Sequence, residues 1–326
     1  MRRILARLCM VVLAGALVSA TVSASSSAAR RTRNSAGAFP VAVRSGDGVV
    51  RIPARPDRIL CLSGSATQML YALGAGSQVV GVDKYSTYPP NAPRTSFTGY
   101  ETSAEDYLPL RPDLVILAFN VNRLIAQLKT LHIPTLLLPP VSSIAGVDHQ
   151  LNELAIATGH RTSGARVEAS LAASFAAAAH RVGGAVRNQT YYVEVGSTLY
   201  SATSKTFIGA VFAIFSMRNI ADAAGSSSGY PQLSAEYLLR ANPDYVVLAD
   251  GQSASAFAHR PGFFALRAVR LHHVIVVPES FAQQWGPHSL EAFANRLAIA
   301  FAPRVRGSGT KAQGARARQA DAVRAA

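Results

Sequence analysis

The sequence predicts an α/β protein of two lobes, each built on a parallel sheet and joined by one long rigid helix. A pattern that occurs twice carries this prediction, because Ser103–Leu117 and Ser234–Leu248 match at a constant offset of 131 positions. In both copies a serine precedes a short helix with an acid in its first turn. A Pro-Asp pair then ends the helix, and an apolar run typical of a buried strand follows. One helix–turn–strand unit used twice at domain-sized spacing indicates two lobes.

The first lobe is predicted over residues 56–143, as strands that alternate with helices. Ser65 and Gln68 fit a capping box that starts a helix, and Gly74 stops that helix. The leader before this lobe, 25–55, is expected to be partly disordered and can add a β-hairpin around Gly46–Gly48. The expected strands are Ile59–Leu62, Val79–Val82, Leu114–Leu117 and Thr135–Leu138. A second helix is expected over Arg123–Leu131.

A helical linker is predicted over 144–188, and the second lobe over 189–303. The linker holds an amphipathic helix, Val147–Thr158, and an alanine-rich helix, Ala165–Val182. Alanine is the best helix former, so we expect this linker to be stiff and to limit hinge motion. The second lobe is expected to contain, in order, Tyr191–Val195 (strand), Phe207–Phe215 (helix), the second copy of the pattern, Val274–Val277 (strand) and Ser289–Phe301 (helix).

Residues 1–24 have the plan of a secretory signal peptide. Three arginines precede the apolar run Leu8–Val18, and Val22-Ser23-Ala24 fits a cleavage site. The apolar run is shorter than the roughly 20 residues that span a bilayer. Arg7, just before Cys9, argues against a lipid-attachment signal. We expect a secreted or cell-envelope protein, with the signal either cleaved or retained as an anchor.

Much of the formal net charge of +14 lies near the two ends of the chain. Residues 304–326 are basic and poor in large apolar side chains, which predicts a disordered tail. In an exported protein such a tail is solvated or contacts an anionic envelope surface. No nucleic-acid motif accompanies it, so no nucleic-acid partner is expected.

Cys61 is the one cysteine outside the predicted signal, which leaves no partner for an intramolecular disulfide. It lies in the apolar run Ile59–Leu62. A small core residue is therefore the favoured interpretation, and a catalytic thiol is the alternative.

Over about 56–302, the chain resembles the substrate-binding proteins of ABC importers for iron complexes (ferric siderophores and haem) and cobalamin. The resemblance rests on segments Arg58–Gln68, Ala72–Gly76, Val80–Asp83 with Tyr85, Tyr88–Pro90, the two Ser-Ala-Glu units and Trp285–Pro287. The chain departs from the family at Gly64, often proline, at Gln68, often glutamate, and at His288, often arginine. The last change removes a cation near the ligand.

The resemblance implies two α/β lobes on one long helix, with a ligand cleft between the lobes. It implies a monomer without a cofactor of its own, which delivers a metal chelate to a separate membrane permease. An iron complex such as a ferric siderophore is the first expectation, and haem or cobalamin is the alternative. In the family an exposed glutamate on each lobe meets arginines of the permease, and Glu105 and Glu236 fit those positions. Stabilisation of the two helix starts is the competing role of these acids.

Loops at the carboxyl ends of parallel strands face ligand, and aromatic faces with a few polar groups suit a chelate. The predicted ligand-binding residues are Ser65, Tyr85, Tyr88, Tyr100, Asn120, Tyr200, Lys205, Tyr230, Trp285 and His288. Tyr88 lies in a stretch similar to that which carries an axial tyrosinate in some haem-binding members, so it is a possible iron ligand if the chelate is haem.

Direct binding of a bare metal and catalysis are disfavoured. The only adjacent histidine pair, His272-His273, has no spaced partner, and no metal-binding motif occurs. Ser63–Thr67 is not a Gly-x-Ser-x-Gly elbow, and Gly74-Ala75-Gly76 ends a helix rather than opening one. A secreted hydrolase is kept as a remote alternative.

Overall fold

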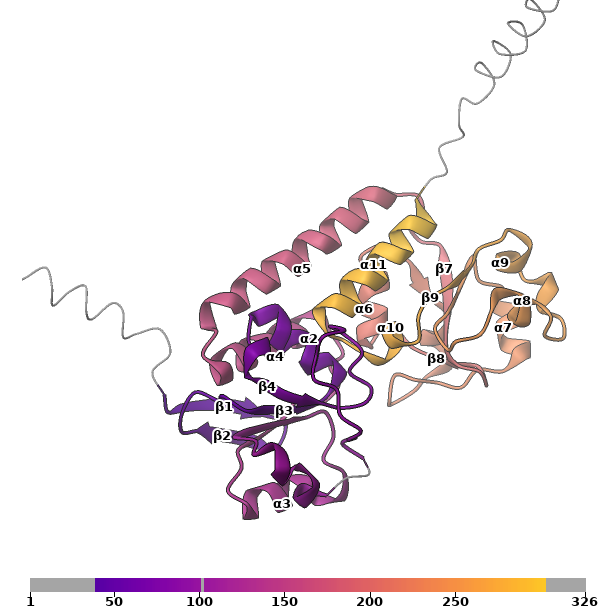
Figure 1. Cartoon of the computed structure of the whole chain (residues 1–326). Coiled ribbons are helices and arrows are strands. Elements are labelled where there is room, and N and C mark those ends of the chain that lie inside the picture. The colour runs from indigo at the N-terminus through magenta and orange to yellow at the C-terminus, as the bar shows by residue number, and fades with distance from the viewer. Residues whose placement is uncertain (1–38, 101–102, 303–326) are drawn as a thin grey trace, which may run out of the picture. The chain divides into compact units, whose positions relative to one another are not determined.

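The computed structural model describes residues 39–100 and 103–302, which form two compact units (Figure 1). The first unit comprises the described residues up to Ala173, together with Lys205–Ala210 and Glu279–Glu291. The second unit comprises Ser174–Ser204, Val211–Pro278 and the described residues from 292 onward. The segments 205–210 and 279–291, which the sequence analysis assigned to the second lobe, therefore pack with the first unit. The predicted signal peptide and basic tail lie outside the described residues.

Four parallel strands form the sheet of the first unit, in the order β4-β3-β5-β6. Their bounds are β3 Ile59–Leu62, β4 Val79–Val82, β5 Leu114–Leu117 and β6 Thr135–Leu137. Every residue of β3 and β5 is buried, as expected for central strands covered on both faces. The four predicted strands are confirmed, and the last is one residue shorter than predicted.

Helices cover both faces of this sheet (Figure 1). Leu60, Leu62, Val115 and Leu117 pack against one layer. That layer is formed by the 3₁₀ helix η2 (Ala104–Leu110) and α3 (Leu124–Thr130), preceded by the 3₁₀ turn η3 (Val121–Arg123). The other layer is formed by α2 (Gly64–Leu73), followed by the 3₁₀ turn η1 (Gly76–Gln78), and by α4 (Ile144–Thr158). The predicted leader hairpin is confirmed as β1 (Val41–Ser45) paired antiparallel with β2 (Gly48–Ile52).

The start of α2 corrects one prediction. Ser63, not Ser65, is the cap, because its side chain accepts from the backbone N–H of Ala66 at 3.3 Å. Ser65 and Gln68 are buried inside the helix and make bonds to a distant segment described below. Gly74 ends the helix in the left-handed conformation, with φ of 86°, as predicted.

The two copies of the repeated pattern fold alike except in their helices. Asp113 accepts hydrogen bonds from the backbone N–H groups of Asp57 and Arg58, just before β3. Asp244 accepts one from the backbone of Thr190, at the start of the equivalent strand in the second unit. The second copy forms an α-helix, α7 (Ala235–Ala241), whereas the first forms the 3₁₀ helix η2, which contains Pro109. Proline has no N–H to donate to an α-helical turn, which accounts for the difference.

The second unit has a five-stranded sheet in the order β11-β10-β7-β8, with β9 also paired to β7. The bounds are β7 Thr190–Gly196, β8 Tyr200–Ser201, β9 Arg218–Asn219, β10 Tyr245–Leu248 and β11 Val274–Val276. Strands β9, β7, β10 and β11 are mutually parallel, and β8 returns antiparallel to β7. The antiparallel strand was not predicted, because two residues are too few to show an alternating pattern.

Aromatic side chains fill the core of the second unit. Tyr192 and Phe257 pack on one face of the sheet, while Tyr191 stacks on Phe212 on the other at 3.8 Å between ring centroids. Phe293 packs edge-on against Phe212.

The remaining helices are α5 Arg161–Val182, α6 Phe207–Ala213, η4 Ile220–Ala224, α8 Ala254–Ala258, η5 Phe263–Ala265, α9 Arg267–Arg270, α10 Ser280–Gln283 and α11 Pro287–Phe301. The two predicted linker helices are confirmed as α4 and α5, although α4 packs on α2 and β1 of the first unit. Within the described residues, no helix combines the length and apolar character needed to cross a membrane.

Cys61 lies in the core, as predicted. It is fully buried on β3, and burial raises the pKa of its thiol to about 12. A thiol that stays protonated at neutral pH is a poor nucleophile, which disfavours the catalytic alternative.

Candidate ligand-binding site

Exposed aromatic side chains gather in the loops that follow the strands of the first sheet. Tyr85 is 53% exposed, Tyr100 48% and Phe119 41%. The rings of Tyr100 and Phe119 are in contact, with centroids 5.7 Å apart. The ammonium of Lys84 lies 5.1 Å from the centre of the Tyr85 ring. We call Tyr85, Tyr100 and Phe119 the aromatic rim. It lies on the edge of a parallel sheet at which ligands commonly bind.

A buried carboxyl group belongs to the same edge. Asp83 follows β4 directly and is only 5% exposed. Burial raises its pKa, and hydrogen bonding with Ser86 opposes the shift. Burial raises the pKa of Tyr100, and the nearby acidic groups of Asp83 and Tyr85 raise it further, so the Tyr100 phenol is neutral at physiological pH. Sequence analysis did not single out Asp83, although its position at a strand end marks it as part of this edge.

Tyr88 and His288, both predicted ligand-binding residues, are brought together although they are far apart in the sequence. Their rings stack in parallel, with centroids 3.5 Å apart. Burial lowers the pKa of His288, so its imidazole is neutral at pH 7. Both residues line a cavity of about 670 Å³ in the first unit, whose other polar and aromatic lining includes Tyr71, His160, Arg166 and Glu291.

Ser65 and Trp285 are also brought together, inside the first unit. The backbone N–H of Trp285 donates to Ser65 Oγ at 3.0 Å, and its indole N–H donates to Gln150 Oε1 at 2.8 Å. Trp285 is 5% exposed and packs against Phe207. Both predicted residues therefore make internal hydrogen bonds here, and a role in binding ligand stays a prediction for them.

The segment that carries Trp285 is fastened to α2 by Gln68. The amide nitrogen of Gln68 donates to Gln284 Oε1 at 2.6 Å and to Ser289 Oγ at 2.8 Å, and its oxygen accepts from the backbone N–H of Ser289 at 3.0 Å. A Cβ atom at Gly286 would lie 2.4 Å from Gln68 Oε1, so only glycine fits beside this amide. Gln68 was predicted as a helix cap. The signal for its actual role was its polar side chain on the apolar face of α2.

Two further predicted residues belong to the first unit but join no cluster. Asn120 Oδ1 accepts from the backbone N–H of Ile125 at 3.1 Å and so fixes the entry to α3. Lys205 is exposed just before α6. Their roles in binding ligand also stay predictions.

In the second unit, Tyr200 and Tyr230 lie on neighbouring segments. Tyr200 is 44% exposed on β8 and forms an isolated bridge with Gln232. Tyr230 is half-buried, and burial raises its pKa. The backbone N–H of Ser201 donates to the carbonyl of Pro231, which holds the two segments together.

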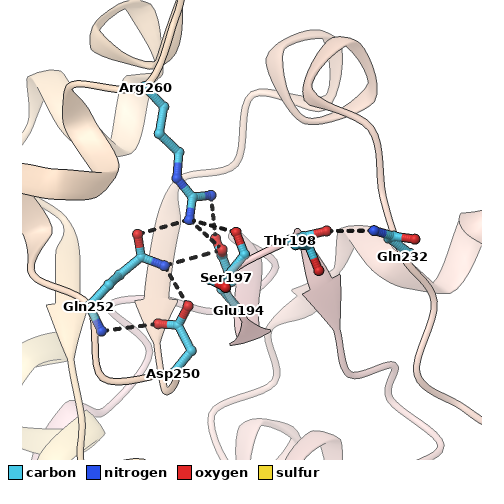
Figure 2. Close-up of polar contacts among 7 residues, drawn as sticks. All are labelled: Glu194, Ser197, Thr198, Gln232, Asp250, Gln252 and Arg260. Carbon is cyan, nitrogen blue, oxygen red and sulfur yellow. Dashed lines mark hydrogen bonds and ion pairs between the residues drawn. The ribbon is translucent and has the colours of Figure 1, made fainter.

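A charged network lies where β7 and β10 end (Figure 2). Arg260 Nη2 lies 2.7 Å from Glu194 Oε1, and Nη1 lies 3.1 Å from Oε2. Nη2 also donates to Gln252 Oε1 and to the carbonyl of Ser197. On the other side of the turn, Gln232 Nε2 donates to the carbonyl of Thr198 at 3.0 Å. The turn between β7 and β8 is thus held from both sides.

Burial dominates the electrostatics of this network. The Glu194 side chain is fully buried, and burial raises its pKa although Arg260 lowers it. A buried carboxylate without its cation would be costly, so Arg260 is needed for the native charge state. Sequence analysis missed this pair. The available signal was a glutamate within the otherwise apolar strand Tyr191–Val195.

The two predicted docking acids are exposed, one in each unit. Glu105 lies in the first turn of η2, and Glu236 in the first turn of α7. Hydrogen bonds with its own backbone and with Ser234 lower the pKa of Glu236, which keeps it ionised. Asp106, the other acid of η2, accepts from the backbone N–H of Ser103 and so serves the helix start.

The fold and the strand-edge aromatic rim define a two-lobed α/β protein of the binding-protein class. A sequence profile for the periplasmic binding protein family matches residues 59–281, more than half of the chain, so the protein belongs to this family. The cobalamin-binding protein of Halobacterium salinarum is 32% identical over 265 residues, covering 77% of this chain and 71% of that protein. An ABC transporter substrate-binding lipoprotein of Bacillus subtilis is 26% identical, covering 78% and 83%. The apo structure of a periplasmic haem-binding protein from Roseiflexus has a TM-score of 0.66 at 26% identity, covering 76% and 98%.

Replacing Gln68 with Leu should destabilise the protein by about 2–4 kcal/mol, because Gln284 and Ser289 are then left buried without their partner. Urea unfolding of the purified protein measures the change. Gln283→Leu is the matched control, since Gln283 is exposed and its amide donates to Glu279, one turn away on the same segment. Equal losses in both variants would contradict the interlocking role of Gln68.

Replacing Arg260 with Met should cost about 3–5 kcal/mol, because the Glu194 carboxylate stays buried without a cation. The double variant Arg260→Met/Glu194→Gln should recover part of the loss, since its buried amide carries no charge. Thermal midpoints at pH 7 compare the two. A double variant no more stable than the single one would show that the ion pair does not control this region.

Proposed function

We propose that the protein is the exported substrate-binding component of an ABC importer, which captures a metal chelate and delivers it to a membrane permease. Family membership supports the binding role. The observation that carries the choice of ligand class is the aromatic rim, whose three exposed rings lie on the ligand-binding edge of a parallel sheet. Aromatic faces contribute large contact areas to flat or rounded ligands. We propose no catalytic activity.

Among chelates, cobalamin and haem are the first ligands to test. The relative from Halobacterium salinarum binds cobalamin by its name, and the Roseiflexus structure is of a haem-binding protein. The ferric siderophore expected from sequence remains in the proposal as a third candidate. All three are metal complexes with extended surfaces, which a rim of aromatic rings with few charges suits.

If the ligand is haem, Tyr88 is the proposed axial ligand to iron, as a tyrosine oxygen can ligate haem. Its stacking on His288 supports this proposal, because the contact restricts the ring to one orientation. The ring is 38% exposed, so ligand can reach it from solvent. A charge-transfer band on adding haem, absent in Tyr88→Phe, is the corresponding signature.

We propose Glu105 and Glu236 as the contacts to the permease. Each occupies the first turn of a short helix in its own unit, and both side chains point into solvent-accessible surroundings. Equivalent acids in equivalent local structures suit a two-point electrostatic contact with basic residues of a partner.

At least one of three chelates (cyanocobalamin, haemin or a ferric trihydroxamate) should raise the thermal midpoint. Stabilisation should approach about 2.7 kcal/mol at a ligand concentration of 100 Kd. Tyr85→Ala and Tyr100→Ala should each weaken binding about tenfold, because each removes an aromatic contact. Isothermal titration calorimetry measures the affinities. Phe264→Ala is the control, since Phe264 is 71% exposed but lies on η5. Turnover of ester substrates without stabilisation by any chelate would contradict the proposal.

The double variant Glu105→Ala/Glu236→Ala should abolish ligand uptake in cells while leaving the affinity for ligand unchanged. The reason is that both side chains are exposed and belong to neither the rim nor the charged network. Uptake of labelled ligand and calorimetry on the purified variant give the two readouts. Weakened ligand binding by the double variant would refute the assignment.

A further inference from the structure

Four oxygen atoms form a continuous chain beneath the aromatic rim. Asp83 Oδ1 lies 2.5 Å from Ser86 Oγ, which lies 3.0 Å from Thr67 Oγ1. Thr67 Oγ1 in turn lies 2.9 Å from the carbonyl oxygen of Ser63. All four residues are at least nine-tenths buried, with exposures between 0% and 5%, so bulk water does not complete these contacts.

Counting protons along this chain gives the charge of Asp83. The Ser63 carbonyl can only accept, so Thr67 donates its one hydroxyl proton to it. The contact between Ser86 and Thr67 then needs the proton of Ser86. The remaining contact, between Asp83 and Ser86, has a proton only if Asp83 supplies it. An ionised carboxylate would leave two protons for three contacts.

We infer that Asp83 is held as a neutral carboxylic acid that donates to Ser86, and that it thereby positions the loop carrying Tyr85 against the start of α2. Thr67 and Ser63 belong to the start of α2 and its cap, whereas Ser86 belongs to the loop. Gln284 Nε2 donates to the carbonyl of Tyr85 at 3.3 Å and holds the same loop from another side.

The surroundings of Asp83 favour the neutral form. The described partner of its carboxyl group is a hydroxyl, because Ser86 Oγ lies 2.5 Å from Oδ1. The titratable groups that face it are the Cys61 thiol on β3 and the Tyr100 phenol. Burial raises the pKa of both, so both are neutral at pH 7. Burial also raises the pKa of Asp83 itself, and this effect outweighs the opposing hydrogen bonds with the side chain and backbone of Ser86.

Ionisation of Asp83 would have two consequences at the rim. Ser86 would turn its proton toward the carboxylate, and the bond between Ser86 and Thr67 would be lost. A negative charge would also appear beneath Tyr85 and Tyr100. Loop order and ligand capture should therefore weaken as pH rises through the pKa of Asp83. The link to ligand rests on the proposed function, whereas the protonation state does not.

Asp83→Asn tests the inference, because an asparagine amide donates to Ser86 as the acid does but does not titrate. In the unfolded chain Asp titrates near pH 3.9. Above that pH the native state keeps a proton that the unfolded state releases, so wild-type stability falls as pH rises. The difference between the thermal midpoints of Asp83→Asn and wild type should therefore change in favour of the variant as pH rises. The expected change is about 2–4 °C per pH unit, until Asp83 ionises in the folded protein.

Scans of the full-length apo protein from pH 4 to pH 9 measure this gain. The control Asp57→Asn, at an exposed side chain, should track wild type at every pH. A second variant, Thr67→Val, removes the acceptor of Ser86 and should shift the wild-type pH dependence toward lower pH. An Asp83→Asn midpoint that falls behind wild type with rising pH, or keeps a constant offset, would overturn the inference.

The carboxyl carbon of Asp83, observed by ¹³C NMR with Asp83→Asn as the assignment variant, gives an independent readout. A shift typical of a neutral acid at pH 6 supports the inference, and a carboxylate shift overturns it. Neither measurement needs a ligand. If no chelate bound, the inference about the protonation state of Asp83 would therefore be unaffected. If a chelate binds, its affinity for wild type should fall at high pH while that for Asp83→Asn stays level. If the affinities of wild type and Asp83→Asn changed with pH in the same way, the positioning role of Asp83 would be overturned, but not its protonation state.

Discussion

The first unit depends on one buried amide, that of Gln68. Its three hydrogen bonds join α2 to the segment 284–289, which comes from the far end of the chain. That attachment brings His288 onto Tyr88 and Gln284 to the loop of Tyr85. An isolated amide is costly to bury, but one whose donors and acceptor are all used specifies a single arrangement. Gly286 is part of the same constraint, because a side chain there would collide with the amide.

The two units contain two different solutions to a buried carboxyl group at a strand edge. In the second unit Glu194 keeps a cation, Arg260, which also holds the turn after β7 (Figure 2). In the first unit Asp83 has hydroxyl partners in place of a cation. The first arrangement places a compensated ion pair beside the loops. In the second, the neutral Asp83 that we infer adds no negative charge beneath the aromatic rim. A carboxyl group held neutral beneath exposed rings would suit a ligand surface that is largely apolar.

The strands could be predicted from sequence because each is a short apolar run with turn-forming residues on both sides. Ile59–Leu62 and Tyr245–Leu248 are examples. The helix end at Gly74 followed from glycine's access to positive φ. The internal hydrogen bonds of Ser65, Gln68 and Trp285 could not be predicted. Their partners lie more than 130 positions away in the sequence. Such long-range hydrogen bonds leave no periodic trace.

Each copy of the repeated pattern contains one acid that serves the fold and another that is exposed. In both copies the aspartate after the proline accepts hydrogen bonds from the backbone at the start of a neighbouring strand. That bond fixes where the short helix meets the sheet, and so fixes the direction of the first turn. The glutamates at 105 and 236 stand in that turn with exposed side chains. Local structure that recurs in both units thus presents one exposed carboxyl group from each, and the proposed two-point contact with a permease rests on this recurrence.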